Sequence, residues 1–445
     1  MPLAFVSLFA VGVFGLGAWV YPARALDGRL PVGGLFVSGV LGLAACHSLV
    51  YAGAPTWTSV AVAIAGGGAG MATLAWRARA SSGARLEAAP SSVLRAAGLA
   101  AVALLPGVRL LTEPLGDYDA RSIWFFQGKI IFFEGGLLSN AWTKPELAFA
   151  RTDYPKLIPL LAAQAGTLAG YWNDYWPKAG LLVLLALLMI GLHSLPFRTP
   201  VVWATAVLML LLEDEAGGHL LSNGYADGYL AGFLLLATAQ LGMFLIVPSR
   251  RSLWLGLASL ALAAQLKNEG IVAASMLLVL FGAAALVRGQ RRAVGVRLEW
   301  SMVIPFLPVF LWFVLRARLG IGNEMAGHAT WATVRGRLGD PSFWDLFARH
   351  LLREAPLAVA LLACLALAAF LPRDLRRGRA AGIGLALAGF TGYAALLAAA
   401  FLATPFPLEW HLQRSLARLS HSATALLWAA LLLGWAGRRH EERVL

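Results

Sequence analysis

Long apolar stretches, separated by short polar segments, dominate the chain. A transmembrane helix needs about 20 predominantly apolar residues, and most of these stretches approach that length. An aqueous strand or surface helix would instead alternate polar and apolar positions. The pattern therefore predicts an all-α fold, a polytopic bundle of membrane-spanning helices. The apolar blocks lie at roughly 3–20, 32–53, 56–76, 93–111, 156–171, 178–196, 200–212, 228–247, 253–265, 270–287, 299–315, 355–372, 381–403 and 415–437.

Composition supports this prediction. The chain has 445 residues, of which 59% are hydrophobic and 13% charged, and its mean hydropathy is +0.71. A soluble domain is about half apolar and a quarter charged, so a soluble enzyme and a disordered chain are excluded. The net charge of +13 is spread over short clusters between apolar blocks rather than gathered in one patch, so no nucleic-acid partner is expected. Cys46 and Cys364 lie inside apolar blocks and indicate neither a disulfide framework nor a metal site.

The basic loops predict the orientation, because short cytoplasmic loops are enriched in Lys and Arg. Nothing basic precedes Arg24, so we expect the N-terminus outside and the C-terminus in the cytoplasm. The segments 112–155, 265–270, 316–354 and 404–414 then lie outside. The basic clusters are Arg24/Arg29, Arg77 to Arg95, Arg250/Arg251, Arg288 to Arg297, Arg373 to Arg379 and the tail with Arg438, Arg439 and Arg443.

This alternation requires an even number of crossings between 112–155 and 265–270, yet five apolar blocks lie there. The block 200–212 is short and ends in Glu213-Asp214-Glu215. We therefore predict that 200–212 is a partial or buried segment, which leaves about 13 full crossings. No fixed-period repeat divides the chain, and the whole is expected to be one integral membrane domain.

The first long outside loop carries candidate chemistry. Glu113, Asp117 and Asp119 follow a membrane helix, and an aromatic stretch with Arg121 and Lys129 comes next. That stretch resembles an amphipathic helix lying in the membrane interface. A carboxylate at the membrane surface can act as a base toward a hydroxyl acceptor. The alternative is that these are ordinary solvated loop charges.

Three later clusters also fall on the outer side. Tyr225-Ala-Asp227 enters an apolar block and either contacts a polar headgroup or supplies a helix N-cap. Lys267-Asn-Glu269 forms a tight turn in which the lysine either holds a phosphate or pairs with the glutamate. The third cluster consists of His411, Arg414 and Arg418, whose helical spacing gives one cationic face. The alternative is that Trp410 and snorkelling arginines anchor this helix at the membrane interface. That alternative is strongest for Arg418.

The remaining polar stretch, 316–354, is long enough for a lid or an acceptor-binding loop, but no residue role is assigned there. Its histidines and acids lack metal-site spacing, and no nucleotide-binding or zinc-hydrolase motif occurs in a convincing context. A transporter should carry ionisable groups near the bilayer midplane, in interrupted helices of matched halves. The sequence shows neither pattern clearly, so chemistry at the outer rim is favoured.

The order of these clusters resembles the GT-C superfamily of glycosyltransferases that use polyprenyl-phosphate sugars, in particular protein O-mannosyltransferases, aminoarabinose transferases and their bacterial relatives. Tyr118-Asp119-Ala-Arg121-Ser-Ile-Trp124 resembles the aspartate motif of the family's first loop. Further similar segments are Thr152-Asp153-Tyr154-Pro155, Tyr225-Ala-Asp227-Gly228, Lys267-Asn268-Glu269-Gly270 and Trp410-His411-Leu412 with Arg414 and Arg418. The resemblance covers roughly residues 95–435, so the catalytic module is taken as 93–445 and residues 1–92 as additional N-terminal helices.

The resemblance implies an inverting glycosyltransferase that moves one sugar from a polyprenyl phosphate to an acceptor hydroxyl. Asp119 would be the catalytic base, with Asp117 as second candidate, and Asp119 lacks the acidic neighbour that the O-mannosyltransferase motif has. The donor phosphate would be bound by Lys267, His411, Arg414 and Arg121. Residues expected to contact the acceptor or the sugar are Asp153, Tyr154, Tyr225, Asp227 and Glu269.

The expected location is the bacterial inner membrane, with the active site on the periplasmic face. No cofactor is expected, although some enzymes of the superfamily use a divalent metal. The acceptor, whether lipid, glycan or protein, and the sugar stay open. Two alternatives also stay open: a ligase that transfers a glycan from a polyprenyl pyrophosphate, and a lipid or solute transporter.

Overall fold

The computed structural model describes residues 2–20, 32–80, 90–215, 221–289, 299–322, 330–354, 379–404 and 406–435. Within these ranges the chain is helical and contains no strand, as the apolar pattern predicts. Among the described residues, seven helices are long and apolar enough to cross a membrane, so the protein is a helical membrane protein. They are Gly33–Tyr51, Ser92–Thr112, Trp176–His193, Asp227–Ile246, Asn268–Val287, Ala380–Ala403 and Leu408–Gly434.

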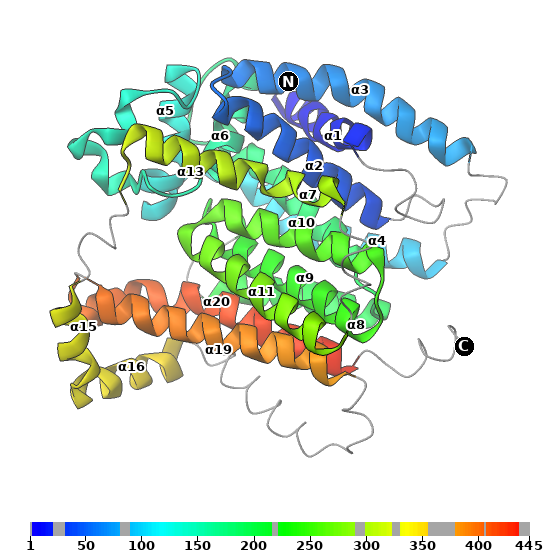
Figure 1. Ribbon diagram of the computed structural model, residues 1–445. Coiled ribbons are helices and arrows are strands. Elements are labelled where there is room, and N and C mark those ends of the chain that lie inside the picture. The colour runs from blue at the N-terminus through cyan, green and yellow to red at the C-terminus, as the bar shows by residue number, and fades with distance from the viewer. Residues whose placement is uncertain are drawn as a thin grey trace.

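The helices follow the apolar blocks closely and form one elongated bundle (Figure 1). Their bounds are α1 Pro2–Val20, α2 Val32–Tyr51, α3 Thr56–Ala80, α4 Pro90–Thr112, α5 Phe126–Glu134, α6 Leu157–Ala169, α7 Leu182–His193, α8 Thr199–Glu215, α9 Asp227–Ile246, α10 Arg250–Leu266, α11 Asn268–Val287, α13 Leu307–Leu319, α15 Trp331–Leu338, α16 Pro341–Glu354, α19 Ala380–Ala403 and α20 Leu408–Trp435. Short turns join them: the π-helical η2 (Ala120–Phe125) and the 3-10 turns η3 (Asn140–Thr143), η4 (Pro145–Ala150), η5 (Trp176–Leu181), η6 (Trp300–Met302) and η7 (Ile304–Phe306).

Helix α9 lies at the centre of the bundle. Of the residues in its apolar stretch 94% are buried, against 17% for α4 at the periphery. It packs against α10, α19 and α20, and it is apolar all round, as expected for a helix surrounded by protein. The same hydrophobic core extends into α1 and α2, so the N-terminal helices and the later ones share one packed interior.

Four arginines lie at one end of the bundle and cap the carbonyls where helices end there, as Arg337 does for α19 at the opposite end. The last carbonyls of a helix have no partner within it, and a guanidinium nearby satisfies them. The contacts run from Arg95 to the carbonyls of His193, Leu195 and Phe197, from Arg251 to Ser194, from Arg288 to Leu245 and from Arg379 to Gly434. These arginines come from four of the loops that the sequence assigns to the cytoplasm.

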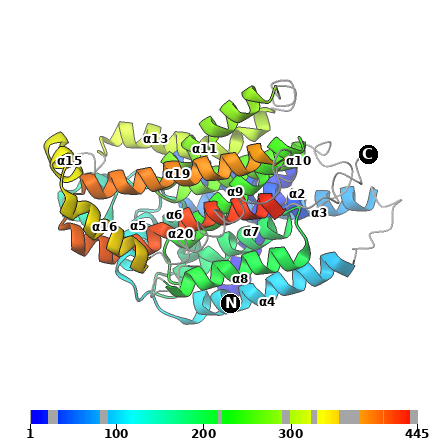
Figure 2. The same cartoon turned by 90° about the horizontal axis from the view of Figure 1, so that it is seen from below.

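The opposite end carries the first long loop and the hairpin of α15 and α16. Figures 1 and 2 both show α5, α15 and α16 at this end and the C-terminus at the other. The start of α9 belongs to this end too, because Arg418 contacts both Asp227 and Asp119 of the first loop. The turn between α10 and α11 joins it there, because Lys267 pairs with Asp227. The outside segments of the sequence-based topology thus gather at one end of the bundle, away from the arginines.

The block 200–212, predicted to be a partial or buried segment, belongs to α8, and the apolar part of this helix, Thr199–Leu210, is shorter than the seven candidate spans. Helix α8 begins beside Arg95, whose guanidinium donates to Thr199.

Helix α6 is a second short apolar helix, with 13 residues. Its N-cap residue Lys156 donates its backbone N–H to the Tyr51 hydroxyl at the end of α2. The segment after α6 returns to the same end, because the Asp174 carbonyl accepts from the N–H of Leu115, just beyond α4. A helix of this length spans only about 20 Å and is too short for the hydrocarbon core. The sequence misses this because α6 is as apolar as a true crossing.

Thiol labelling tests the orientation. Tyr118 lies at the end with the first loop and is 66% exposed, and Val247 lies at the arginine end and is 42% exposed. We expect a membrane-impermeant maleimide to label Tyr118→Cys in intact spheroplasts, and to label Val247→Cys only after the membrane is opened. Both variants carry Cys364→Ala, and the buried Cys46 serves as the internal control. Labelling of Val247→Cys from outside would invert the proposed topology.

Candidate functional site

Five charged side chains from four separate segments form one network at the end of the bundle that carries the first loop. Arg418 Nη1 lies 2.8 Å from Asp119 Oδ2 and 3.7 Å from Asp227 Oδ2. Lys267 Nζ lies 2.9 Å from Asp227 Oδ1 and 3.6 Å from Glu269 Oε1. Two cations therefore alternate with three carboxylates, and the formal charge of the network is −1 when every group is ionised.

Three members lie at or next to the ends of helical elements. Asp119 immediately precedes the π-helical turn η2, a form of helix that is rare and often found at functional sites. Lys267 is an extended residue between α10 and α11, with φ −149° and ψ 165°. Asp227 is the first residue of α9, but its side chain does not cap the helix, so the capping alternative for Asp227 is wrong.

Burial decides which members of the network can meet a ligand. The side chains of Asp227 and Lys267 are only 4% and 8% exposed, whereas that of Asp119 is 29% exposed. Burial alone lowers the pKa of Lys267, but the carboxylates of Asp227 and Glu269 outweigh it and raise this pKa well above its usual value. Lys267 is thus a fixed positive charge. Asp119 is the most open carboxylate, and its Oδ1 accepts no hydrogen bond from any residue that the structure describes.

Tyr225 covers Arg418. The guanidinium carbon lies 4.5 Å from the centre of the Tyr225 ring, a cation–π arrangement. Burial raises the pKa of Tyr225 to about 12, so its hydroxyl keeps its proton at neutral pH. The Arg418 side chain is 17% exposed and therefore reachable beside Asp119.

The returning end of the first loop is tied to the same network. Asp153 Oδ2 accepts a 2.8 Å hydrogen bond from Asn268 Nδ2, which stands between Lys267 and Glu269. Burial raises the pKa of Asp153, and the Asn268 hydrogen bond and the charge of Lys156 partly oppose that rise. The bond aligns the loop with the α10–α11 turn.

A buried lysine anchors this return. Lys156 Nζ donates to Gln127 Oε1 and to the Thr152 carbonyl, and lies 4.8 Å and 4.4 Å from the ring centres of Trp142 and Trp312. Burial lowers the pKa of Lys156 well below its usual value. Sequence analysis assigned no role to Lys156. The sequence feature that could have identified Lys156 is a single lysine, three residues after Asp153, at the start of an apolar block.

The predicted site residues separate into two groups. Asp119, Tyr225, Asp227, Lys267 and Glu269 belong to the network, and Asp153 joins it through Asn268. Tyr154 stacks on Trp124 at 5.3 Å and lies near Lys267 and Glu269. Asp117 is partly buried near Tyr225 and forms no ion pair within the described part of the chain.

Three predicted phosphate contacts lie apart from the network. Arg121 and Arg414 are exposed, and His411 packs between the rings of Phe401 and Phe406 at 4.9 Å and 5.7 Å. Arg418, which the sequence suggested was a snorkelling anchor, is the cation that Asp119 actually contacts. Arg414 and Arg418 lie one helical turn apart on the same face of α20, and spacing alone could not tell which of them lies level with Asp119.

The aromatic stretch of the first loop is helical as expected, but it does not lie free at the interface. Trp124 and Phe125 in η2 are 2% exposed, and Ile131 in α5 is fully buried. These side chains pack against α6 and help to hold Asp119 above the core.

Two acceptor atoms beside the network have no partner. Asn268 Oδ1 and Glu269 Oε2 are buried and accept no hydrogen bond from the described residues. A buried acceptor without a donor is costly, so these oxygens suit hydroxyl or amine donors of a ligand. Within the described ranges no group of three or more His, Cys, Asp or Glu side chains could hold a metal ion.

Comparison with known proteins adds no relative. No protein-family model matches the chain, and no match is found among curated proteins or solved structures.

Exchanging Asn268 tests the link between the loop and the turn. We expect Asn268→Ala to lower the free energy of unfolding by about 1–3 kcal/mol, because it leaves the buried Asp153 carboxylate without its donor. Asn268→Asp should destabilise more, since it sets a second carboxylate against Asp153. Unfolding of the purified variants in detergent provides the measurement. Equal stability of Asn268→Asp and the parent protein would show that this hydrogen bond does not hold the loop.

Proposed function

We propose that the protein is an inverting glycosyltransferase that moves a sugar from a polyprenyl-phosphate donor to an acceptor hydroxyl at the outer face of the membrane. The observation that carries the proposal is the Asp119–Arg418 pair. It joins the most open carboxylate of the network to a partly exposed cation, at the end of the bundle opposite the arginine-capped end. Activation of the nucleophile needs a carboxylate as base, and stabilisation of a departing phosphate needs a cation. The pair places both groups side by side.

In the proposed reaction Asp119 Oδ1 takes the proton of the acceptor hydroxyl. The acceptor oxygen attacks the anomeric carbon of the donor sugar, and the bond from that carbon to the phosphate oxygen breaks. The electron pair leaves with the phosphate, so polyprenyl phosphate is the second product. Asp119 keeps one oxygen on Arg418 and presents the other, unbonded to any described residue, to the acceptor.

We place the leaving phosphate against Arg418. Its guanidinium can bind a phosphate and Asp119 at the same time because it has five N–H donors. Lys267 lies deeper and is held by two carboxylates, so it stabilises negative charge through its field rather than by first contact. Arg121, His411 and Arg414 would not contact the leaving phosphate and would only border the site.

The sugar hydroxyls fit the unpaired oxygens of Asn268 and Glu269. The negative formal charge of the network also favours hydroxyl-rich or amine-bearing groups there over a second phosphate. Tyr154 and Tyr225 then border the sugar position, and Asp153 and Asp227 support the residues that contact it.

The alternatives differ in what they require. A ligase that uses a pyrophosphate donor needs further free cations, but Arg337 in α15 is occupied by the carbonyls of Phe401, Leu402 and Thr404. A transporter needs ionisable groups along a path through the bilayer midplane, whereas this network lies at one end of the bundle. The glycosyltransferase proposal therefore has the stronger support.

The test is transfer from radiolabelled polyprenyl-phosphate sugars to lipid, glycan and protein acceptors by the purified protein. Transfer with inversion at the anomeric carbon, abolished in the Asp119→Asn variant, is the expected result. Activity only with pyrophosphate-linked glycans would favour the ligase. Addition and chelation of divalent metal in the same assay would settle metal dependence, which the proposal does not require.

A further inference from the structure

The turn between α2 and α3 lies against the first loop, although these helices precede the part of the chain that carries the site. The backbone N–H of Thr56 donates to the Gly135 carbonyl at 2.8 Å, where α5 ends. Gly53, in the turn, approaches Leu138 so closely that a Cβ atom there would lie 3.0 Å from its Cδ1. Figure 1 shows α6 beside this end of the two helices. The N-terminal helices are therefore in direct contact with the loop that holds Asp119.

Three buried hydrogen bonds fasten α6 to the same two helices. Tyr51, the last residue of α2, accepts the backbone N–H of Lys156 on its hydroxyl oxygen at 3.1 Å. Gln164 in α6 donates to Ser59 Oγ in α3 at 2.9 Å, and its Oε1 lies 3.3 Å from Nε2 of His47 in α2. All five residues are buried. Breaking such bonds where no water can replace them is costly, so α6 is held in one position against α2 and α3.

From α6 the contacts continue to the helix that follows Asp119. Lys156 Nζ donates to Gln127 Oε1 at 2.6 Å, and Gln127 Nε2 in turn holds two backbone carbonyls at the return of the loop. Gln127 is the second residue of α5, and α5 follows directly on η2, which begins immediately after Asp119. A continuous series of hydrogen bonds and helix thus leads from Tyr51 to Asp119.

A small apolar core, separate from the main core of the bundle, surrounds these hydrogen bonds. It is built from α2, the first loop, α5, α6 and α13, and its larger members include Tyr51, Ile131, Trp142, Leu160 and Trp312. The rings of Tyr51 and Trp312 lie 6.3 Å apart. None of these residues belongs to the ion network, so this core holds the loop without itself forming the site.

Helix α1 packs closely against α3 and fixes it in turn. A Cβ atom at Gly15 would collide with the Gly67 carbonyl oxygen, and one at Gly70 would collide with the Gly15 carbonyl oxygen. Glycines allow two helix backbones to approach this closely. The three N-terminal helices therefore form one tightly packed support under the first loop.

We propose that helices α1–α3 position the catalytic base, and that Tyr51 is a positioning residue that acts on Asp119 through Lys156 and Gln127. The role of Asp119 itself rests on the proposed function. Asp119 is held on one side by Arg418, so its place in the site also depends on the helix that follows it. A reacting group that is misplaced by about 1 Å can cost about a hundredfold in rate.

Tyr51→Phe isolates this positioning role, because it keeps the ring beside Trp312 and removes only the hydroxyl that accepts the Lys156 N–H. The probe is the polyprenyl-phosphate sugar that the parent protein transfers. We expect single-turnover transfer at saturating donor to slow about tenfold, the factor that corresponds to one lost hydrogen bond, with an unchanged donor Kd. Lys156→Met should slow transfer further, because it also releases Gln127. A merely structural role would lower the folded fraction and leave the rate of each folded molecule unaltered.

Hydrogen exchange of the segment 120–134 provides a second readout that needs no substrate. Exchange of these amides depends on local opening of η2 and α5, so the loss of one hydrogen bond in Tyr51→Phe should speed it about tenfold. Mass spectrometry of the purified full chain measures the exchange, and circular dichroism verifies the fold of each variant.

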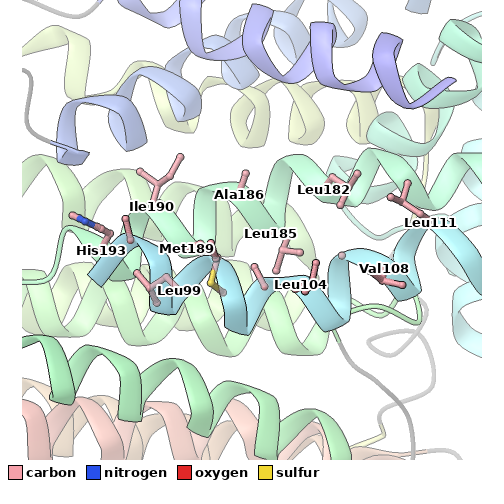
Figure 3. A pocket seen from close by; sticks show the side chains of 14 residues that line it. Leu99, Leu104, Val108, Leu111, Leu182, Leu185, Ala186, Met189, Ile190 and His193 are labelled. Atoms are coloured by element: carbon pink, nitrogen blue, oxygen red, sulfur yellow. The ribbon is translucent and has the colours of Figure 1, made fainter. Parts of the chain in front are cut away.

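Two further variants control for stability. Thr205→Val removes the 3.0 Å hydrogen bond from the Trp428 indole N–H, between α8 and α20. Leu185→Ala removes a buried side chain at the apolar groove between α4 and α7 (Figure 3), and should cost more stability than one hydrogen bond. Neither residue belongs to the first loop or to α1–α3. Both variants should keep the single-turnover rate of the parent protein and its exchange in 120–134.

Equal slowing of transfer in Leu185→Ala would overturn the inference, because the rate would then follow stability. A weaker donor Kd in Tyr51→Phe with an unchanged rate would also overturn it, since positioning of the base does not act on donor binding. If 120–134 opens in Tyr51→Phe but the parent protein transfers no sugar, the proposed function fails and the anchoring of the loop by α1–α3 stands. If the parent protein transfers sugar and Tyr51→Phe does so at the same rate, the positioning role alone fails.

Discussion

The Asp119→Asn variant should fold, insert and bind donor, yet turn over about a hundred- to ten-thousand-fold more slowly than the parent protein. Asparagine keeps the shape of the side chain and can still accept a hydrogen bond from Arg418, which lies 2.8 Å away. It cannot take the proton of the acceptor hydroxyl, and general-base catalysis typically contributes this much. Single-turnover transfer, with donor binding measured separately, tests the expectation.

Asp117→Asn is the matched control. Asp117 lies in the same loop two residues earlier, but it makes no ion pair with Arg418 within the described part of the chain. Its variant should lose far less activity. If Asp117→Asn is inactive while Asp119→Asn retains full turnover, the base is Asp117. Full activity of both variants would remove the proposed mechanism.

Lys267→Met should destabilise the protein by about 3–5 kcal/mol, whatever the substrate. The ammonium is 8% exposed and holds Asp227 at 2.9 Å and Glu269 at 3.6 Å. Methionine has a similar length but leaves the carboxylates without this cation, and removal of one partner from a buried pair costs this much. Unfolding in mixed detergent, followed by helical circular dichroism, measures the loss.

The double variant Lys267→Met/Asp227→Asn serves as the control. Because it removes both charges of the closest pair, we expect it to lose less stability than the two single variants summed, which is the signature of direct coupling. Additive losses would mean that Lys267 and Asp227 contribute independently and that the network is not a coupled unit. Weaker donor binding in Lys267→Met, after correction for the folded fraction, would add support for the long-range role of this charge.

Much of the architecture can be predicted from the sequence because it depends on local properties. The apolar blocks predict the helices, and the basic loops identify the end at which Arg95, Arg251, Arg288 and Arg379 cap carbonyls. The return of α6 to its starting end could not be predicted in this way, because α6 is as apolar as a membrane-spanning helix and only the pairing of Leu115 with Asp174 shows it.

The candidate site was predictable as a set of segments but not as a set of contacts. Short motifs indicated Asp119, Asp227 and Lys267, since polar residues at the ends of apolar blocks are conspicuous. The partner of Asp119 was not predictable, because Arg121 is closer along the chain and Arg418 lies 299 residues away. Arg414 and Arg418 share one face of α20, and which of them lies level with Asp119 depends on the position of that helix along the bundle, a property of packing that spacing does not determine.

The 299-residue separation between Asp119 and Arg418 also bears on how the protein is made. Helices enter the membrane in order from the N-terminus, so Asp119 and Asp227 are inserted long before the last helix supplies Arg418. Until then the nascent protein holds carboxylates without one of their two counter-ions. The site is thus complete only once α20 has been inserted, and a chain truncated before α20 should be recognised as unfinished and degraded by membrane proteases.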